Sequence, residues 1–293
     1  MRRYFKINFK IVVVKISNSD DTEQRIKELS RNLQAFENNK DSIIYLTSVQ
    51  GTTPLSLLPL AVLTAKITKS PHHLQNIIPP DDQNVNNYLN VISFPNGITE
   101  YRSAKYAPHL SILHFDIEKL TPDVKSMVET ALNKYQELLS PVIKKGEDGI
   151  VYFFNEIITN IYEHSGSKNL WIFVQLLKKK EEVEICVIDE GMGFKEAYKK
   201  AGIDMNNDID AIRSALEGKS SKKEEDGRGW GIRSTKRIIT ESDFNGEFVI
   251  ITGKGGYYFN KNYFFDFPIW QGTIVMARIK KPKEKVEIYR YVE

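Results

Sequence analysis

The side chains best suited to chemistry stand one helical turn apart in the segment Phe153–His164. Glu156, Asn160 and His164 are spaced four residues apart, so a helix would place them in one stripe. A carboxamide oxygen is a hard ligand that suits Mg²⁺, and a carboxylate can orient or deprotonate a nucleophile. The solvated polar face of an ordinary surface helix has the same pattern, and for this helix taken alone that simpler interpretation is favoured.

A second group of residues follows an apolar strand. The run Glu184–Ile188 is followed directly by Asp189 and then by Gly191 and Gly193. A carboxylate at the end of a strand can accept a hydrogen bond from an exocyclic amine such as that of adenine, and glycines let the backbone approach a ligand closely. Taken alone, an ordinary turn at the end of a strand explains the segment at least as well.

Three alternating glycines, Gly227, Gly229 and Gly231, lead directly into a helix that we predict over Ser234–Ile239. Backbone amides at such a junction, together with the helix N-terminus, can hold phosphate oxygens. The dinucleotide-binding fingerprint does not fit, because no strand precedes the glycines. The P-loop pattern is also absent, because Arg213 stands where its first glycine belongs.

Periodicity predicts the elements that would hold these groups. The pattern favours helices over Pro122–Leu139 and Ile150–His164, and strands over His109–Asp116, Leu170–Leu177, Val183–Ile188, Gly246–Ile251, Gly256–Phe259 and Gly272–Ile279. Pro141–Asp148 is expected to break the helical pattern, and Phe194–Asp226 to form a long, mostly polar connection. The last strand begins with the pair Gly272 and Thr273, which by itself carries no functional information.

The order of these motifs is more informative than any one of them. A helix with Glu-x-x-x-Asn, a strand with Asp-x-Gly-x-Gly, a polar connection, Gly-x-Gly-x-Gly before a helix, and Gly-Thr on a last strand together resemble the GHKL superfamily. That group contains the gyrase, heat-shock chaperone, histidine-kinase and mismatch-repair ATPases. The resemblance covers residues 108–281 and implies an α/β fold, a two-layer sandwich in which helices cover a mixed sheet. It also implies ATP and Mg²⁺ as cofactors.

The resemblance assigns a role to each motif. Glu156 would be the activating, catalytic carboxylate and Asn160 would ligate Mg²⁺, while Asp189 would contact the adenine amine directly and through a water. The connection Phe194–Asp226 would be a mobile ATP lid. The residues that would bind ATP or its metal are Asn160, His164, Asp189, Gly191, Gly193, Lys219, Gly227, Arg228, Gly229, Gly231 and Thr273.

The remaining histidines argue against one subtype. His72, His73, His109 and His114 lack the context of a phospho-accepting histidine, so an autophosphorylating histidine kinase is not expected. The short stretch after Ile279 leaves no transducer domain of the gyrase or chaperone kind. A compact C-terminal ATPase with Glu-x-x-x-Asn looks more like the anti-sigma-factor serine kinases, in which the carboxylate can activate a protein serine.

The N-terminal part, residues 1–105, is predicted to be a separate α/β domain. Its expected strands and helices are Phe9–Ile16, Thr22–Phe36, Ser42–Val49, Leu55–Ile67 and Val85–Ile92. This alternation is similar to the STAS fold of anti-sigma antagonists. The position of their phospho-acceptor reads Thr52–Ser56 here, a degraded pattern, and an unrelated α/β domain fits about as well. Residues 282–293 are expected to form a charged tail.

Composition limits the class of protein. The 41 basic and 38 acidic residues give a net charge of +3, which offers no argument for nucleic-acid binding. Cys186 is the single cysteine and is expected to be a buried thiol in a reducing compartment. Lysines interrupt the apolar N-terminus, and the apolar run Leu55–Ile67 is shorter than the roughly 20 residues that cross a bilayer. A cytoplasmic location without membrane contact is therefore expected.

Three functions remain open. The first is an ATP-binding regulatory switch that phosphorylates or sequesters a protein partner, for which the resemblance suggests a STAS-like or sigma-factor-like regulator. The second is a slow ATPase whose homodimerisation depends on nucleotide. The third is a non-catalytic interaction module. The enzyme, where there is one, is expected to be an ATPase or a protein serine/threonine kinase.

Overall fold

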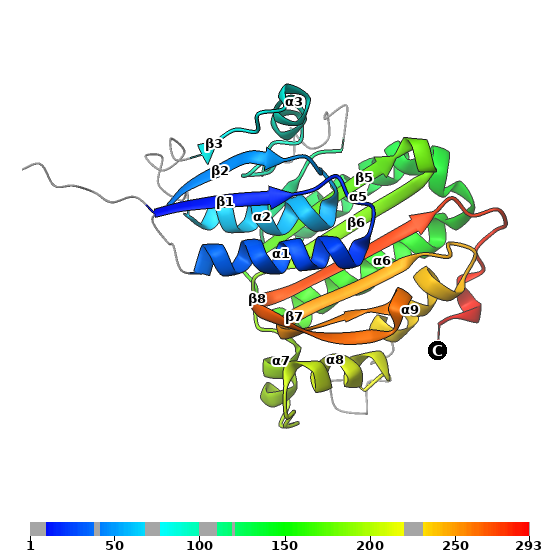
Figure 1. The fold of residues 1–293 in the computed structure, drawn as a ribbon. Helices are drawn as coiled ribbons and strands as arrows, with labels where there is room; N and C mark the ends of the chain where they lie inside the picture. Colours follow the sequence, from blue (N-terminus) through cyan, green and yellow to red (C-terminus); the bar gives the residue numbers. More distant parts are fainter. Residues whose placement is uncertain are drawn as a thin grey trace, which may run out of the picture.

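The computed structural model describes residues 10–37, 42–67, 77–99, 110–118, 121–219 and 231–292. Its strands and α-helices are, in chain order, β1 (Lys10–Ile16), α1 (Thr22–Glu37), β2 (Ser42–Val49), α2 (Pro54–Ile67), β3 (Ile77–Ile78), α3 (Gln83–Val91), β4 (Leu113–Asp116), α5 (Pro122–Ile143), α6 (Glu147–Asn160), β5 (Asn169–Leu177), β6 (Glu182–Asp189), α7 (Phe194–Lys200), α8 (Asp208–Leu216), α9 (Gly231–Glu241), β7 (Glu247–Tyr258) and β8 (Tyr263–Lys280). Figure 1 shows their arrangement.

The N-terminal residues form a small parallel sheet with two helices on one face. Its strand order is β1-β2-β3, and both ladders are parallel. The apolar residues predicted on one face of α1 are all buried: Ile26, Leu29, Leu33 and Phe36. The expected alternation of strands and helices is confirmed, because each apolar stripe needs a sheet or a helix to cover it.

The larger sheet has five strands in the order β4-β5-β6-β8-β7, and all four ladders between them are antiparallel. Successive side chains of a strand point to opposite faces of its sheet. On β6, Val183, Ile185 and Val187 therefore join one hydrophobic core, whereas Cys186 and Ile188 join another. Cys186 is fully buried, as expected, and burial raises the pKa of its thiol well above the ordinary value.

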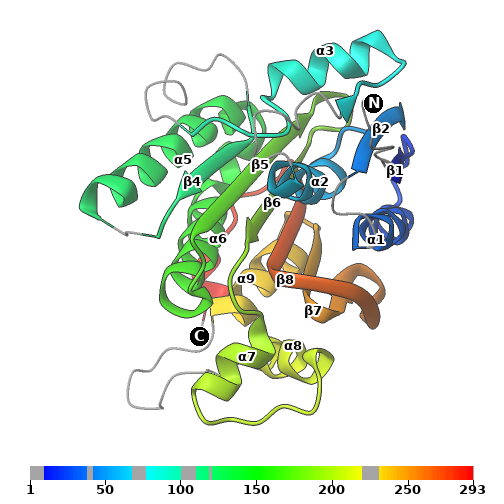
Figure 2. The same ribbon diagram turned by 90° about the vertical axis from the view of Figure 1, so that its left-hand side faces the viewer.

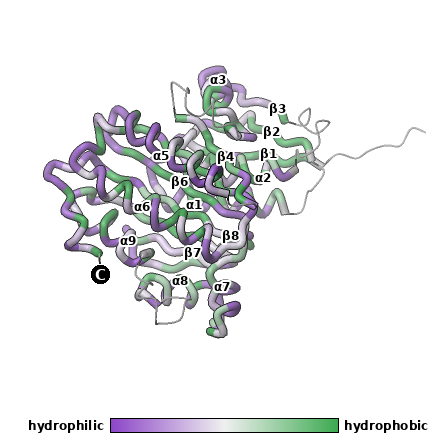
Figure 3. The backbone as a smooth tube through the Cα atoms, turned by 180° about the vertical axis from the view of Figure 1, so that it is seen from behind, coloured by the Kyte–Doolittle hydropathy of each residue, from purple (hydrophilic) through white to green (hydrophobic). Residues whose placement is uncertain are grey.

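Helices α5, α6 and α9 cover one face of this sheet, which gives the helix-covered α/β layer expected from the resemblance (Figure 2). The other face is covered as well. Helices α1 and α2 lie between the small sheet and the large one, so the chain is built in four layers (Figures 1 and 2). Coloured by hydropathy, the tube shows its hydrophobic stretches mainly on the strands and its hydrophilic stretches mainly on outer turns (Figure 3).

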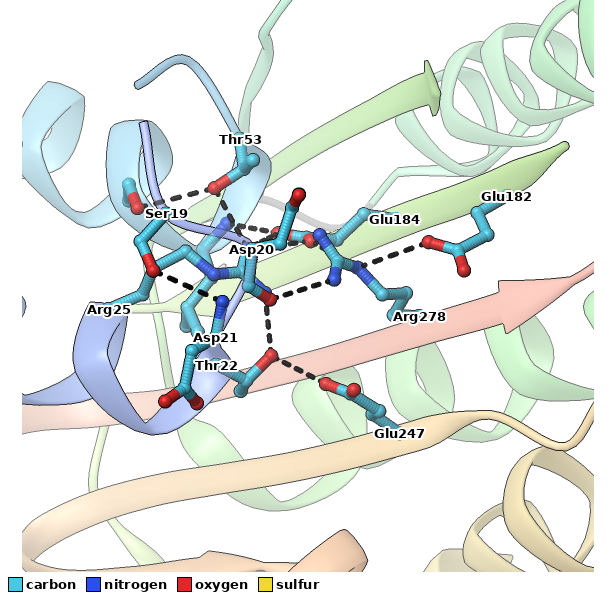
Figure 4. A network of polar contacts seen from close by, with 12 residues as sticks. Ser19, Asp20, Asp21, Thr22, Arg25, Thr53, Glu182, Glu184, Glu247 and Arg278 are labelled. Atoms are coloured by element: carbon cyan, nitrogen blue, oxygen red, sulfur yellow. Dashed lines mark hydrogen bonds and ion pairs between the residues drawn. The ribbon is translucent and has the colours of Figure 1, made fainter. Parts of the chain in front are cut away.

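A buried network of polar groups joins the N-terminal layer to the large sheet (Figure 4). Arg25 Nη1 of α1 lies 2.7 Å from Glu184 Oε2 of β6, and both side chains are at most 1% exposed. Arg278 Nε of β8 donates to the same carboxylate oxygen at 3.1 Å, and the backbone N–H of Leu55 donates to Glu184 Oε1 at 3.0 Å. The two parts of the chain therefore share one interior.

The structure differs from the sequence prediction where proline and glycine were taken as breaks. Helix α5 continues through Pro141 to Ile143 and is followed by a 3₁₀ turn (Lys144–Gly146) and then by α6. Pro141 lies in the last turn of α5, so it disturbs few helical hydrogen bonds. Ile143, at the end of the helix, is buried. Gly146 packs on a ring instead of forming a loop: a Cβ there would lie 2.2 Å from Phe244 Cε1.

Two other segments are more ordered than expected. The predicted polar connection Phe194–Asp226 contains α7 and α8, and Ile212 of α8 is fully buried in the core beneath the helices. The two strands predicted on either side of Thr252–Gly255 form the single strand β7, which shifts register at Gly253. In the tail, Val286 is buried against the same core.

None of the described helices combines the length and the apolar character needed to cross a bilayer.

Candidate nucleotide site

The expected adenine contact, Asp189, faces the helix layer. It follows Val183, Ile185 and Val187 at a spacing of two, and these residues pack under α5 and α6. Thr273 is its register partner on β8 and belongs to the same face. Asp189 is 2% exposed. The strand bearing the aspartate and the helix bearing Glu156 therefore lie on the same side of the sheet.

Hydrogen bonds and burial act on Asp189 in opposite directions. Burial raises the pKa of Asp189 to about 7, even though the Gly191 N–H and the side chain and N–H of Thr273 hydrogen-bond to it and favour the charged form. The Gly191 N–H donates to Oδ1 over 2.8 Å. Burying a charged carboxylate costs free energy unless hydrogen-bond donors surround it. One further donor would therefore stabilise the charged form of Asp189.

The loop after Asp189 is tied to the end of the helix layer. After α6 the chain makes a π-helical turn, η3 (Ile161–Ser165), and the Ser165 carbonyl accepts from the Met192 N–H at 2.8 Å. The Ser167 hydroxyl accepts from the Glu190 N–H at 3.0 Å. A Cβ on Gly191 would lie 2.1 Å from the Ser165 oxygen, so only glycine allows this approach.

Two further glycines close the other side of the loop. A Cβ on Gly193 would lie 2.4 Å from Thr252 Oγ1, which accepts from the Phe194 N–H at 3.2 Å and donates to the Gly272 carbonyl at 3.0 Å. Gly272 has a φ of +89°, and a Cβ there would lie 2.1 Å from the Asp189 carbonyl oxygen. The glycine of the Gly-Thr pair thus lets β8 approach the end of β6.

Glu156 lies where the third phosphate-loop glycine begins a helix. Helices α6 and α9 pack side by side, and a Cβ on Gly231, the first residue of α9, would lie 2.0 Å from Glu156 Oε2. One turn before Glu156, the pKa of Tyr152 is raised by burial and then by the Glu156 charge. The helix that carries Glu156 and Asn160 therefore contacts α9 at its first residue, Gly231.

Asn160 has the character of a ligand-binding residue. Its Nδ2 atom is buried and has no hydrogen-bond partner among the described residues. Such an atom is costly unless a ligand or water supplies an acceptor. The same carboxamide offers an oxygen of the kind that Mg²⁺ prefers, and amide orientation is assigned from its partners. Asn160 therefore fits either a phosphate oxygen or a metal ion.

The other predicted residues are placed less informatively. His164 lies in η3 and is half-buried. Lys219 follows α8, where its ammonium is exposed and 3.0 Å from Glu217 Oε2. The predicted phosphate-binding residues Gly227, Arg228 and Gly229 lie outside the described residues.

Sequence reasoning missed the groups that hold the loop in place. Ser165, Ser167 and Thr252 use hydroxyls or carbonyls to fix Glu190, Met192 and Phe194. The sequence Ser165-Gly166-Ser167 directly after a helix is a usable signal, because a left-handed glycine commonly ends a helix and its φ is +59° here. Nothing in the pattern around Thr252 indicates its role.

Comparison with known proteins agrees with this geometry. Neither the curated proteins nor the solved structures contain a significant match. One family does match, over a range that includes the residues from Glu156 to Thr273 discussed above. Residues 145–283 match the family described as histidine kinase-, DNA gyrase B-, and HSP90-like ATPase, so this part of the chain is similar to the ATPase domains of that family.

Proposed function

We propose that this protein is a magnesium-dependent ATP-binding switch that phosphorylates a protein partner on serine or threonine, or sequesters it, according to the bound nucleotide. The observation that carries the proposal is the contact between Glu156 and Gly231, which brings a carboxylate to the start of helix α9. A helix N-terminus attracts phosphate oxygens. A carboxylate beside it would be able to accept the proton of a hydroxyl that attacks a bound terminal phosphate.

The proposed chemistry is a phosphoryl transfer. Glu156 accepts the proton of a serine or threonine hydroxyl while the hydroxyl oxygen bonds to the γ-phosphorus, and the bond from that phosphorus to the β–γ bridging oxygen breaks to release ADP. Asn160 would hold Mg²⁺ through its carboxamide oxygen, and that ion supplies charge neutralisation at the phosphates. Asp189 accepts a hydrogen bond from the adenine amine.

The acceptor hydroxyl is proposed to come from a partner, because two hydroxyls of the stretch Thr52–Ser56, those of Thr53 and Ser56, are engaged or buried. Thr53 Oγ1 accepts from Arg25 Nη1 at 2.9 Å, and Ser56 is 6% exposed. Phosphorylation of Ser56 would require α2 to move, because that side chain is buried. His114 stacks on Trp171 with ring centroids 3.6 Å apart, which supports a mechanism without a phospho-histidine.

The outer face of the small sheet supports the partner-binding part of the proposal. On β1, Ile11 and Val13 are 57% and 45% exposed. Parallel sheets are almost always covered on both faces. We assign this face to the protein that receives the phosphate, and expect Val13→Asp to lower its phosphorylation without changing ATP affinity. Unchanged phosphorylation would rule out this face. A monomeric mass for the variant against a dimeric wild type would mean that a second copy covers it.

Labelled ATP and candidate serine/threonine partners provide the main test. Transfer of label to a partner is expected from the wild type and from Glu137→Ala, which alters an exposed carboxylate on α5. Glu156→Ala should lose transfer by a factor of about a hundred or more while still binding ATP. Unchanged transfer in Glu156→Ala would disprove the mechanism. Phosphate release without any labelled protein would instead identify a slow ATPase.

A further inference from the structure

Helix α2 of the N-terminal layer lies along strand β6 and contacts acidic residues near both ends of that strand. Near the start of β6, the Leu55 N–H of α2 donates to Glu184 Oε1 at 3.0 Å. Near its end, Lys66 Nζ lies 3.3 Å from Glu190 Oε2. From Leu55 to Lys66 a helix rises about 16 Å, and from Glu184 to Glu190 a strand covers about 20 Å. The two segments are similar in length, so α2 contacts β6 near both ends of the strand and can brace it.

The residue at the far end of this brace, Glu190, lies directly between Asp189 and Gly191. Its side chain points to the N-terminal layer, where Oε1 accepts from Trp171 Nε1 at 2.9 Å. Its backbone N–H donates to the hydroxyl of Ser167, in the loop before β5. Glu190 is therefore held both by its side chain and by its main chain.

Lys66 is the charged partner in this arrangement. Its side chain is one third exposed, whereas that of Glu190 is 12% exposed. The ammonium also lies 5.9 Å from the centre of the Trp270 ring on β8. An ion pair that is partly shielded from water contributes more stabilisation than a fully exposed one, because water and salt screen its charges less.

We propose that Lys66 is a positioning residue for nucleotide binding: by pairing with Glu190, it fixes the loop that carries Asp189 and Gly191 against adenine. The inference rests on the proposed contact between Asp189 and the adenine amine. It makes the N-terminal layer part of the nucleotide site, although residue 66 lies far outside the matched range 145–283. By linkage, a ligand that moves α2 would change ATP affinity, and ATP would change the affinity for that ligand by the same factor.

The test uses the full chain and three variants, with ATP and inosine triphosphate as probes. Inosine triphosphate lacks the adenine amine, so it reports contacts other than the one with Asp189. Lys66→Met should weaken ATP binding roughly threefold to tenfold and leave inosine triphosphate within about twofold, so that the preference for ATP shrinks. Lys66→Arg should restore it. Lys27→Met is the matched control, because it removes an exposed lysine of α1 that pairs with Glu23.

Three titration results would overturn the inference. One is an unchanged ATP affinity in Lys66→Met. Another is an equal loss for both nucleotides, which would indicate general damage to the fold. The third is Lys66→Arg behaving like Lys66→Met.

A measurement on the nucleotide-free protein separates this inference from the proposed function. Hydrogen exchange of the Gly191 and Met192 amides, which donate to Asp189 and Ser165, should be faster in Lys66→Met than in Lys27→Met. Equal exchange in the two variants would contradict the positioning role. Failure of the wild type to bind ATP would disprove the proposed function, and the exchange rates would still decide whether Lys66 holds the loop.

Discussion

Asp189 titrates near neutrality because its carboxylate is buried on the helix side of the sheet, where water cannot solvate the charge. Its hydrogen bonds from Gly191 and Thr273 recover only part of that loss. An adenine amine would add one more donor, and its hydrogen bond would be stronger to the ionised carboxylate than to the neutral acid. The protonation state of Asp189 would then connect nucleotide affinity to pH.

We predict that ATP binding strengthens as the pH rises from 6 to 8. With a pKa of about 7 in the free protein, Asp189 is mostly neutral at pH 6, and the neutral acid is the weaker acceptor for the adenine amine. The affinity should therefore be lower at pH 6 than at pH 8, by up to about tenfold. Calorimetric titration across this range measures the effect. Asp189→Asn is the control, because the ATP phosphates titrate in the same way with either protein. An equally steep pH dependence of ATP affinity in this variant would exclude Asp189 as the cause.

The close approach of Gly231 to Glu156 leads to a second prediction about a single residue. A methyl group there would meet Glu156 Oε2 at 2.0 Å and push the carboxylate away from the start of α9. Gly231→Ala should therefore lower phosphoryl transfer or ATP hydrolysis about a hundredfold, with ATP affinity changed much less. Steady-state rates measure this. Adding Gly231→Ala to Glu156→Ala should have little further effect, and a large additional loss would show that the glycine acts on something else.

At the scale of elements, the sequence predicts the helices and strands better than their ends. Helix α6 and strand β6 follow from apolar spacing, because each buries a continuous stripe or face. The continuation of α5 past Pro141 could not be predicted, since it depends on Ile143 being buried by distant strands. Gly146 and Gly253 look like breaks in the sequence, yet they serve close packing against Phe244 and Asp208.

The candidate site could be predicted in part for the same reason. Glu156, Asn160 and Asp189 stand out because their types and spacing are themselves chemical signals. The sequence at Ser165 indicates only the end of a helix, and Thr252 gives no signal, because their roles depend on which backbone groups the fold brings to them. Contacts made by a carbonyl oxygen, such as that of Ser165, leave no mark on residue type.

The contact between η3 and the loop after β6 leads to a prediction about both elements. Gly191→Ala would place a methyl group 2.1 Å from the Ser165 carbonyl oxygen, so α6 and the loop must separate. We expect a loss of about 1–3 kcal/mol in the free energy of unfolding and a clear loss of ATP affinity. Urea denaturation and calorimetry measure the two effects. Gly202→Ala is the control, because nothing lies within 4 Å of that added methyl and only its φ of +82° is unfavourable. Equal ATP affinities in the two variants would contradict the role assigned to Gly191.

At the scale of the whole molecule, the two sheets are joined by charges that are far apart in the sequence. Arg25 and Glu184 are separated by 159 positions and are both buried. Burial alone would raise the pKa of Glu184, but the charges of Arg25 and Arg278 and the Leu55 N–H outweigh it and hold that pKa below the ordinary value. The stabilisation from this group is therefore present above the ordinary carboxyl pKa and is lost as the pH falls through the lower, folded value.

This network predicts that the N-terminal layer and the part of the chain built on the five-stranded sheet unfold together. Arg25→Met would leave Glu184 with Arg278 as its remaining cation inside the protein, and removing one partner of a buried ion pair costs about 3–5 kcal/mol. The free energy of unfolding from urea titration should fall by that amount in a single transition. Tryptophan fluorescence, to which Trp171 and Trp270 in the shared core contribute, and circular dichroism should both show it. Lys27→Met on the exposed side of the same helix should leave the transition unchanged. Two separate transitions in Arg25→Met, with only one shifted, would mean that the layers fold independently. In that case α2 would not be held firmly against the large sheet, and Lys66 could not position the loop after β6.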